Sequence, residues 1–296
     1  MKLILHSDDF GLHREINRAI LSVAAKGMLT STSLLVNGPA AGDAVEQVKA
    51  YPLLGVGLHL NIVRGRPLSH PDEIPSLVDK NGLFFNSAGK LLLKSLLGRI
   101  SHNDVYLEYR RQLLYMMDRK ITPTHFDGEK HTHLLLPEAV RALKRLMDEY
   151  KIKKVRTINE SPVNKTLISS GIAIKGNIQQ RLKLMFLEYR TKKACQFWTN
   201  FKTPGFFFGV SVSGHIHYPE SVRMAVKLLE LKLKGTLEWM LHLGYPADLS
   251  SRDFKRNLGN FFLSNTRTEE LKLLLSREFA EKLEQNRDNL ISYREL

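Results

Sequence analysis

Acidic residues and histidines gather where several apolar segments of this chain end. Asp8 and Asp9 follow the first apolar run, and His59 and His242 stand near the ends of two later runs. A further run, over 122–127, leads into five such side chains within nine residues: His125, Asp127, Glu129, His131 and His133. Repulsion and desolvation make such a group costly unless a cation balances it. The pattern therefore predicts a bound metal ion.

The types of these side chains indicate what the ion could do. The single cysteine, Cys195, has no Cys partner, so the donors are imidazole and carboxylate groups, which suit Zn²⁺ best and also Mn²⁺ or Mg²⁺. Three protein ligands would leave a position for water, whose pKa the ion lowers. A nearby carboxylate could accept the proton of this water, and an imidazole could protonate the leaving group. Hydrolysis of an amide or ester is the favoured chemistry.

Each of these residues taken alone also has a structural explanation. Asp8 or Asp9 could cap the helix that is predicted to begin near His13, because an N-cap residue accepts backbone N–H bonds. A lone histidine on a strand is more often a buried hydrogen-bond partner than a metal ligand. The dense group over 125–133 is hard to explain in this way, and it favours the metal site.

Alternating strands and helices are predicted to carry these residues. Strands are expected over 3–6, 32–36, 56–60, 122–127, 153–157 and 236–242, and helices over 16–24, 44–50, 104–120, 138–150, 220–233, 268–276 and 277–284. This order predicts an α/β fold whose parallel strands have helices outside them, as in a (β/α) barrel. The carboxyl ends of such strands meet on one face, so the polar residues are expected to converge there.

One domain over 1–296 is expected, with a long excursion over 61–100 and a basic, partly irregular insertion over about 160–205. Of the 296 residues 43% are hydrophobic, which excludes a disordered chain, and the lone cysteine excludes a disulfide scaffold. The first residues do not resemble a signal peptide, and no apolar stretch approaches the roughly 20 residues that span a bilayer. A cytoplasmic protein is expected, and an oligomer is compatible with the sequence.

The net charge of +14 is concentrated in one region, because 15 basic and four acidic residues lie between Arg141 and Lys202. Aromatic residues are interleaved with them, as in nucleic-acid-binding surfaces, but no nucleic-acid motif accompanies them and no nucleic-acid partner is expected. A helix over 181–193 would place basic residues beside an apolar strip, which with Trp198 suits an anionic membrane surface; the alternative is a strip packed on the barrel. The residues of this helix are Arg181, Lys183, Arg190, Lys192 and Lys193, and Leu182, Leu184, Met185, Phe186 and Leu187.

Four motifs of the chain resemble those of the YdjC-type carbohydrate deacetylases, including the branch that acts in hopanoid glycolipid synthesis. The first is LHSDDFGL over 5–12, followed by Asn17 and by GMLTSTSLLVN over 27–37. The others are GLHL over 57–60, THFDGEKHTHL over 124–134 and EWMLHLG over 238–244. The resemblance is strong through residue 160 and stays in register to about residue 275.

The resemblance implies a barrel-like fold related to polysaccharide deacetylases, and removal of an acetyl group from an N-acetylated sugar with a divalent metal. It assigns Asp9 and His59 to the metal and Asp8 to the general base. The family usually has a histidine where this chain has Glu129, so Glu129 is the expected third ligand, with His131 as the alternative. His242 is the expected general acid.

Other residues near the motifs receive supporting roles in this interpretation. Asn17, Asp127 and Arg156 are assigned to substrate binding, and His125 and His133 are alternative ligands or partners that orient the ligands. The expected substrate is an N-acetylated sugar or a glycolipid, such as a lipid-linked amino sugar at the inner face of a membrane. The alternatives are a sugar-binding protein without activity, since the third ligand departs from the family pattern, and a basic protein that binds nucleic acid or a membrane surface.

Overall fold

Six parallel strands form the centre of the molecule. The computed structural model describes residues 1–174, 177–246 and 265–296, and in these ranges the strands follow the spatial order β4-β3-β2-β1-β6-β5. The strands are β1 (Lys2–Phe10), β2 (Ser31–Leu34), β3 (Gly55–Leu60), β4 (Phe126–Gly128), β5 (Phe206–Phe208) and β6 (Thr236–Leu241). Each neighbouring pair is parallel, so the predicted parallel sheet is confirmed.

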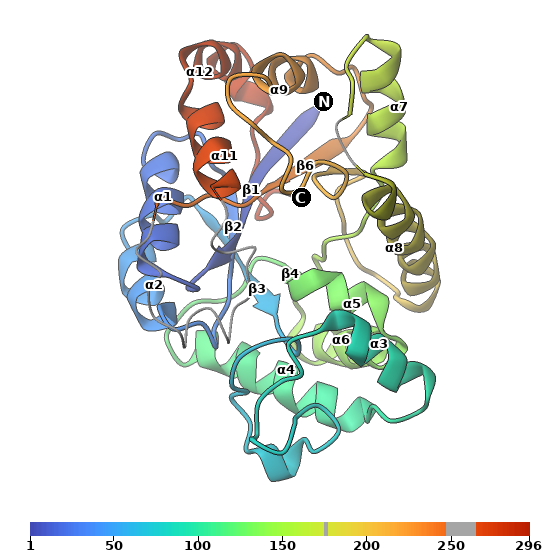
Figure 1. Ribbon diagram of the computed structural model, residues 1–296. Coiled ribbons are helices and arrows are strands. Elements are labelled where there is room, and N and C mark those ends of the chain that lie inside the picture. Colours follow the sequence, from blue (N-terminus) through green and yellow to red (C-terminus); the bar gives the residue numbers. More distant parts are fainter. Residues whose placement is uncertain (175–176, 247–264) are drawn as a thin grey trace.

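Helices surround the curled sheet, as Figure 1 shows, with α1 and α2 on one side and α7 and α8 on the other. The helices are α1 (Arg14–Ala24), α2 (Ala41–Val48), α3 (Ala88–Leu96), α4 (His102–Met117), α5 (Thr132–Leu135), α6 (Pro137–Tyr150), α7 (Ser161–Ser169), α8 (Ile178–Phe197), α9 (Val222–Leu229), α11 (Thr266–Leu275) and α12 (Arg277–Glu284). Short 3₁₀ turns are η1 (Pro71–Glu73), η2 (Glu129–His131) and η4 (Arg287–Asn289). The predicted barrel-like α/β fold with outer helices is confirmed.

The strands carry apolar residues on one face and polar residues on the other. On β1, Leu3 joins the apolar core, whereas His6 and Asp8 belong to a buried polar network inside the curl of the sheet. On β6, Trp239 joins the core and Glu238 joins the network. Successive side chains of a strand point to opposite faces, so this period of two places the charged groups together inside the curl.

Two parts of the sheet differ from the prediction. The segment 153–157 forms only isolated bridges and no continuous ladder: Val155 pairs with Phe126 and Lys154 pairs with Lys202. Arg156 N donates to the carbonyl of Phe126 at 2.9 Å, and Val155 N donates to the carbonyl of Lys202 at 3.0 Å. In contrast, β5 is a strand that the sequence did not predict. Its three residues are too few to separate a strand from a loop by periodicity.

The segments 61–100 and 160–205 contain more helix than the sequence indicates. The first holds η1 and α3, and the second holds α7 and α8. Two of these helices have side-chain N-caps: Ser87 caps α3, and Asn177 and Gln180 form a capping box at the start of α8. Residues 175 and 176 of the predicted insertion, and 247–264 of the segment with family resemblance, lie outside the described residues.

The predicted helix over 181–193 is confirmed as part of α8, but its apolar strip is divided between two faces. Leu184 and Leu187 are buried, whereas Leu182, Met185 and Phe186 are exposed. The helix therefore packs one apolar face on the molecule and presents a second to the outside. The predicted packing holds for Leu184 and Leu187, whereas binding of the exposed residues to a membrane stays a prediction.

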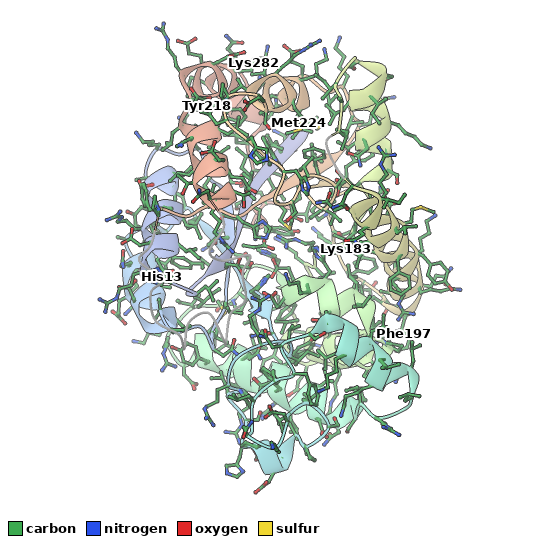
Figure 2. All side chains as sticks on the ribbon, in the orientation of Figure 1. His13, Lys183, Phe197, Tyr218, Met224 and Lys282 are labelled. Atoms are coloured by element: carbon green, nitrogen blue, oxygen red, sulfur yellow. The ribbon has the colours of Figure 1, made fainter. Side chains whose placement is uncertain are left out.

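Two residues that were predicted for the outer surface of this region lie elsewhere. Lys183 lies on the side of α8 that faces the middle of the molecule (Figure 2), where it lines a pocket. Trp198 is buried, and its Nε1 donates to the carbonyl of Val140 at 3.0 Å. Within the described ranges, no helix is long and apolar enough to cross a membrane.

Candidate metal and catalytic site

A pocket of about 200 Å³ lies at the carboxyl ends of the strands. Its lining includes six of the predicted site residues: Asp8, Asp9, His59, Glu129, His131 and His242. They come from β1, β3, the turn after β4 and the residue after β6. The sequence segments that were expected to meet at one edge of the sheet therefore do meet there.

Three of these side chains bring possible ligand atoms together. Asp9, His59 and Glu129 each offer one atom, and the three atoms lie within 4.8 Å of one another. The Nε2 atom of His59 is 3.9 Å from Asp9 Oδ1 and 3.4 Å from Glu129 Oε2. The spacing leaves the three atoms facing a common centre, as a metal ion requires.

Neighbouring groups orient each of these ligand atoms. The Nδ1 atom of His59 is 2.9 Å from Asp127 Oδ1, which places the ring proton on Nδ1 and leaves the Nε2 lone pair facing the carboxylates. Arg267 binds the other oxygen of Asp9, and Arg64 binds the other oxygen of Glu129. The outer atoms are thus held by the protein, while the inner atoms face the pocket.

The buried groups around this trio carry an excess of negative charge. Five carboxylates are buried in the connected network: Asp8, Asp9, Asp127, Glu129 and Glu238. Three buried guanidinium groups bind them: Arg64, Arg156 and Arg267. Within these eight side chains, with the histidines neutral, five negative and three positive charges leave an excess of two, which a divalent ion would balance. Lys130 and Lys183, which also line the pocket, lie outside this count. The donor set and its charge therefore fit a divalent metal.

The pKa of His59 responds to the same excess of charge. Burial lowers it, but the neighbouring carboxylates of Asp127 and Glu129 outweigh burial and raise the pKa of His59 well above its usual value. A proton on His59 thus supplies part of the positive charge that an ion would otherwise bring.

Backbone conformation at the end of β1 allows two consecutive aspartates to line one pocket. Neighbouring residues of a regular strand would point to opposite faces. Here the register with β2 shifts between Ser7 and Phe10, and Asp9 has a left-handed φ of 70°. Lys130 and His131, in the turn after β4, have φ values of 52° and 57°. Left-handed conformations of residues other than glycine cost on the order of 1 kcal/mol each and concentrate at functional sites.

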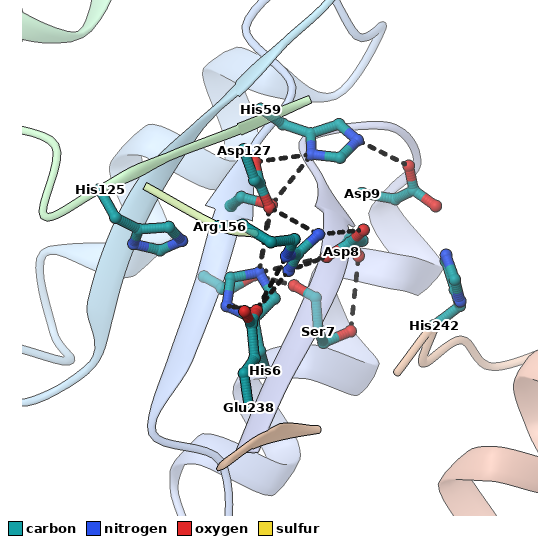
Figure 3. A network of polar contacts seen from close by, with 12 residues as sticks. His6, Ser7, Asp8, Asp9, His59, His125, Asp127, Arg156, Glu238 and His242 are labelled. Carbon is teal, nitrogen blue, oxygen red and sulfur yellow. Dashed lines mark hydrogen bonds and ion pairs between the residues drawn. The ribbon is translucent and has the colours of Figure 1, made fainter. Parts of the chain in front are cut away.

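Arg156 holds Asp8 from below the pocket. Its Nη1 and Nη2 atoms donate to the two oxygens of Asp8 at 2.9 and 2.8 Å, and the Nε2 atom of His6 is 3.2 Å from the same carboxylate (Figure 3). Burial raises the pKa of Asp8, but the charge of Arg156 outweighs it and holds the pKa well below its usual range. Asp8 is therefore a fixed, ionised carboxylate at the floor of the pocket.

Asp127 and Arg156, which were assigned to substrate binding, lie beneath the pocket with their charged groups bound by other residues. Arg156 contacts Asp127 Oδ2 at 3.0 Å, and its Nε donates to Glu238 Oε1 at 2.9 Å. The Oδ1 atom of Asp127 is bound to His59. These contacts give both residues the task of orienting Asp8 and His59.

Asn17, the third residue assigned to substrate binding, fastens a loop. Its Oδ1 accepts from Gly11 N at 2.7 Å, and its Nδ2 donates to the carbonyl of Ala40 at 3.1 Å and to Asp43 Oδ2 at 2.8 Å. The amide thus ties the turn after β1 to the start of α2. The assignment of Asn17 to substrate binding stays a prediction.

Tyr293, near the carboxyl end of the chain, belongs to the same buried network, and no motif predicted it. Its hydroxyl donates to Glu238 Oε2 at 2.5 Å, and its ring stacks on His125 with the centroids 3.6 Å apart. The His125 ring in turn needs the glycine at position 57, because a Cβ there would lie 2.4 Å from it. His125 therefore packs beneath the pocket and does not line it, and with His6 and Asp127 it forms another of the groups of possible ligands in the described residues.

The other three histidines predicted for the site, His131, His133 and His242, differ in their surroundings. His131 lines the pocket, but its atoms join none of the possible ligand groups found in the described residues. His133 donates from Nε2 to the carbonyl of Arg156 at 3.1 Å. His242 lines the pocket, and its backbone N donates to Glu270 Oε2 at 2.5 Å. Burial lowers the pKa of His242 to about 4, although the nearby carboxylates oppose this effect.

His133 makes a testable contribution to stability in acid. Burial lowers its pKa to about 4, whereas an unfolded histidine has a pKa of about 6.5. Between these values the unfolded chain binds the extra proton, so each pH unit of acidification costs about 1.4 kcal/mol of folding free energy. In metal-free protein, His133→Gln is expected to reduce the pH dependence of the unfolding free energy between pH 6 and 4.5 by about 1.4 kcal/mol per pH unit, as measured by urea unfolding. His70→Gln, at an exposed position, is the control, and equal slopes in both variants would contradict the prediction.

The site places a cluster of acidic residues and histidines, compatible with a divalent metal, at the strand ends of a parallel α/β fold. The chain belongs to the YdjC-like protein family, whose family model matches residues 2–285. A crystal structure from Enterococcus faecalis, of a provisionally named cellobiose-phosphate cleavage protein, is similar with a TM-score of 0.72 and 21% identity, covering 99% of this chain and 98% of that one. At this identity the similarity shows the fold alone.

Several curated relatives are named deacetylases. The carbohydrate deacetylase of Halalkalibacterium halodurans is 35% identical over 176 residues, or 60% of this chain and 72% of that protein. The carbohydrate deacetylase of Geobacillus stearothermophilus is 36% identical over 156 residues, which are 52% of this chain and 60% of that protein. The chitooligosaccharide deacetylase of Serratia marcescens is 33% identical over 138 residues, which are 45% of this chain and 50% of that protein. The matches thus span from 50% to 72% of the length of these relatives.

Proposed function

We propose that this protein is a metal-dependent deacetylase that removes the acetyl group from an N-acetylated sugar. The observation that carries the proposal is the convergence of Asp9, His59 and Glu129 in a pocket that Asp8 and His242 also line. The relatives named carbohydrate and chitooligosaccharide deacetylases support this reaction and this class of substrate.

Asp9 Oδ1, His59 Nε2 and Glu129 Oε2 would hold the ion, which we propose is Zn²⁺, with Mn²⁺ and Mg²⁺ as alternatives. Such an ion acidifies a water molecule and polarises the carbonyl of the acetyl group. Arg64 and Arg267 keep the outer carboxylate oxygens in place, so that the inner oxygens stay directed at the ion. Two carboxylates and one imidazole leave room for water and substrate.

We assign the acceptance of the water's proton to Asp8. The carboxylate lines the pocket beside the trio, and Arg156 fixes its position and keeps it ionised. Its low pKa makes Asp8 a weak base, so it would depend on a bound ion to acidify the water.

We assign the protonation of the leaving amine to His242. Its pKa of about 4 makes the imidazole neutral at pH 7 in the resting pocket. Negative charge that develops on the acetyl oxygen during attack raises the pKa of a neighbouring imidazole. His242 can then take up the proton from Asp8 and pass it to the amine nitrogen, so that the C–N bond breaks to give acetate and an amino sugar.

The finer proposal is that the sugar is carried on a lipid at the cytoplasmic face of a membrane. Gln180 and Lys183 of α8 line the pocket, while Leu182 and Met185 on the outside of the same helix are exposed. A sugar whose lipid remains in a bilayer beside this helix would be close to the pocket. Gln180 and Lys183 would then contact the sugar.

Acetate release tests the proposed function. Zinc-loaded protein is incubated with soluble N-acetyl sugars and with an N-acetylglucosaminyl lipid in mixed micelles, and we expect release that a chelator abolishes and added Zn²⁺ restores. Faster release from the lipid would support the finer proposal. Sugar binding by calorimetry without acetate release, in protein with a full complement of metal, would instead establish the alternative of a sugar-binding protein without activity.

A further inference from the structure

Helix α8 presents an apolar face to the outside of the molecule. Leu182, Met185 and Tyr189 are 58%, 66% and 54% exposed, although the helix is well formed. Their spacing of three and four residues places them on one side, together with Ile178 and Phe186. The opposite side holds the buried residues Leu184, Leu187, Thr191 and Ala194. We name the exposed side, Ile178, Leu182, Met185, Phe186 and Tyr189, the outer face of α8.

Basic residues border this outer face. Arg181, Lys192 and Lys193 are exposed, and Lys193 Nζ lies 5.8 Å from the centre of the Tyr189 ring. The single acidic residue of the helix, Glu188, turns toward α7, where its carboxylate accepts from the backbone N of Ser161 at 2.7 Å. The charge that α8 presents around the outer face is therefore entirely positive.

The outer face belongs to the same helix as two residues that line the pocket. Gln180 and Lys183, on the inner side of the helix, line the pocket, so α8 forms part of its wall. In Figure 2, Lys183 points toward the middle of the molecule and Phe197 stands at the outer end of the helix. A surface that docks on the outer face would therefore leave the pocket side of the helix uncovered.

We propose that the outer face of α8 docks on the surface of an anionic lipid bilayer. A helix with an exposed apolar strip and basic borders inserts its apolar side chains at the headgroup boundary, while the basic side chains contact anionic headgroups. A second copy of the chain would bring like charges together. Three of the five side chains of the outer face, Ile178, Leu182 and Met185, are aliphatic, which suits lipid better than nucleic-acid bases that stack on rings such as those of Phe186 and Tyr189. The proposal concerns attachment and does not depend on the deacetylase reaction.

Co-sedimentation with vesicles tests the charge requirement. The full chain is mixed with vesicles of phosphatidylglycerol and phosphatidylcholine, or of phosphatidylcholine alone, and we expect binding to the anionic vesicles only, weakening as salt increases. Arg181→Glu, Lys192→Glu and Lys193→Glu together are expected to weaken this binding at least about tenfold. The matched control reverses the charge of three exposed lysines in the loops before β2 and β6, by Lys26→Glu, Lys232→Glu and Lys234→Glu. It is expected to bind anionic vesicles as tightly as the unchanged protein does.

A double variant, Leu182→Gln with Met185→Gln, tests whether binding requires the apolar side chains of the outer face, and it is expected to bind vesicles less tightly. The control Leu53→Gln changes a leucine that is 88% exposed elsewhere, and it is expected to leave vesicle binding unchanged. In a Cys195→Ser background, a fluorophore on a cysteine at position 185 is expected to shift to the blue with anionic vesicles, and one at position 53 is not. The proposal would be overturned if the protein bound no vesicles, or if the charge control lost as much vesicle binding as the α8 variant. It would also be overturned if the protein formed concentration-dependent dimers that the Gln variants abolish, or if it bound RNA as tightly as anionic vesicles. Acetate release from a soluble sugar, measured on the same variants, is expected to be unchanged and separates this test from that of the proposed function.

Discussion

Replacing Glu129 by Gln is expected to release the metal ion and to lower kcat/KM by at least about 100-fold, since loss of a residue that only orients a ligand already costs up to that factor. Gln keeps nearly the same volume and an acceptor for Arg64, but it lacks the anionic oxygen that faces His59 Nε2 at 3.4 Å. Metal content after gel filtration, measured by mass spectrometry, and acetate release from an N-acetyl sugar check the prediction.

His131→Ala is the matched comparison, because His131 lines the same pocket and was the alternative third ligand. Its ring lies edge-on to Phe207 with the centroids 6.2 Å apart, and among the described residues it joins no group of possible ligands. We expect this variant to keep its metal. The opposite result, with metal kept by Glu129→Gln and lost by His131→Ala, would transfer the third ligand position to His131.

The convergence of the site could be predicted because it depends on the order of the strands. Parallel strands bring their carboxyl ends to one edge, so Asp9, His59 and Glu129 meet although they are far apart in the sequence. The helix-cap explanation for the aspartate pair was wrong. The structure places His13 at the cap of α1, where its Nδ1 accepts from Glu15 N at 3.1 Å.

The residues that hold the ligands could not be predicted in the same way. Arg64 lies in the segment 61–100, Arg267 lies in the first turn of α11, and Tyr293 lies beyond the motifs. Each reaches the site only through tertiary packing. A single arginine or tyrosine in a loop or at the end of a chain has no sequence pattern that distinguishes it from a surface residue. Pairs of residues 65 and 258 positions apart, such as Glu129 with Arg64 and Asp9 with Arg267, require the folded chain.

The sequence of α8 illustrates another limit. Apolar residues lie on two opposite sides of this helix, so periodicity alone could not separate the side that packs from the side that is exposed. Leu184 and Leu182 are alike in type and two positions apart, yet one is buried and the other is 58% exposed. Lys183, between them, was predicted for the outer surface and instead lines the pocket.

Replacing Asp8 by Asn is expected to leave the metal in place and to lower kcat by about 10²- to 10⁴-fold, the range for loss of a general base. Asp8 is not one of the three residues assigned to the ion, and His59 keeps its bond to Asp127 in this variant. An amide cannot accept the proton of the attacking water. Its NH₂ group also faces one of the Arg156 donors, so we expect a loss of about 1–3 kcal/mol in the free energy of unfolding.

Tyr293→Phe separates the loss of a proton acceptor from the loss of stability, because Tyr293 supports Glu238 in the same network and does not line the pocket. Removal of its hydroxyl leaves a carboxylate oxygen of Glu238 without this donor, which is expected to destabilise the fold by a similar amount while Asp8 keeps both bonds to Arg156. We therefore expect kcat to fall less than about tenfold in Tyr293→Phe, with rates expressed per folded, metal-loaded molecule. Equal losses of kcat in the two variants would mean that Asp8 acts by supporting the network. The proton acceptor would then be another residue of the pocket, with His242, neutral at pH 7, as the next candidate.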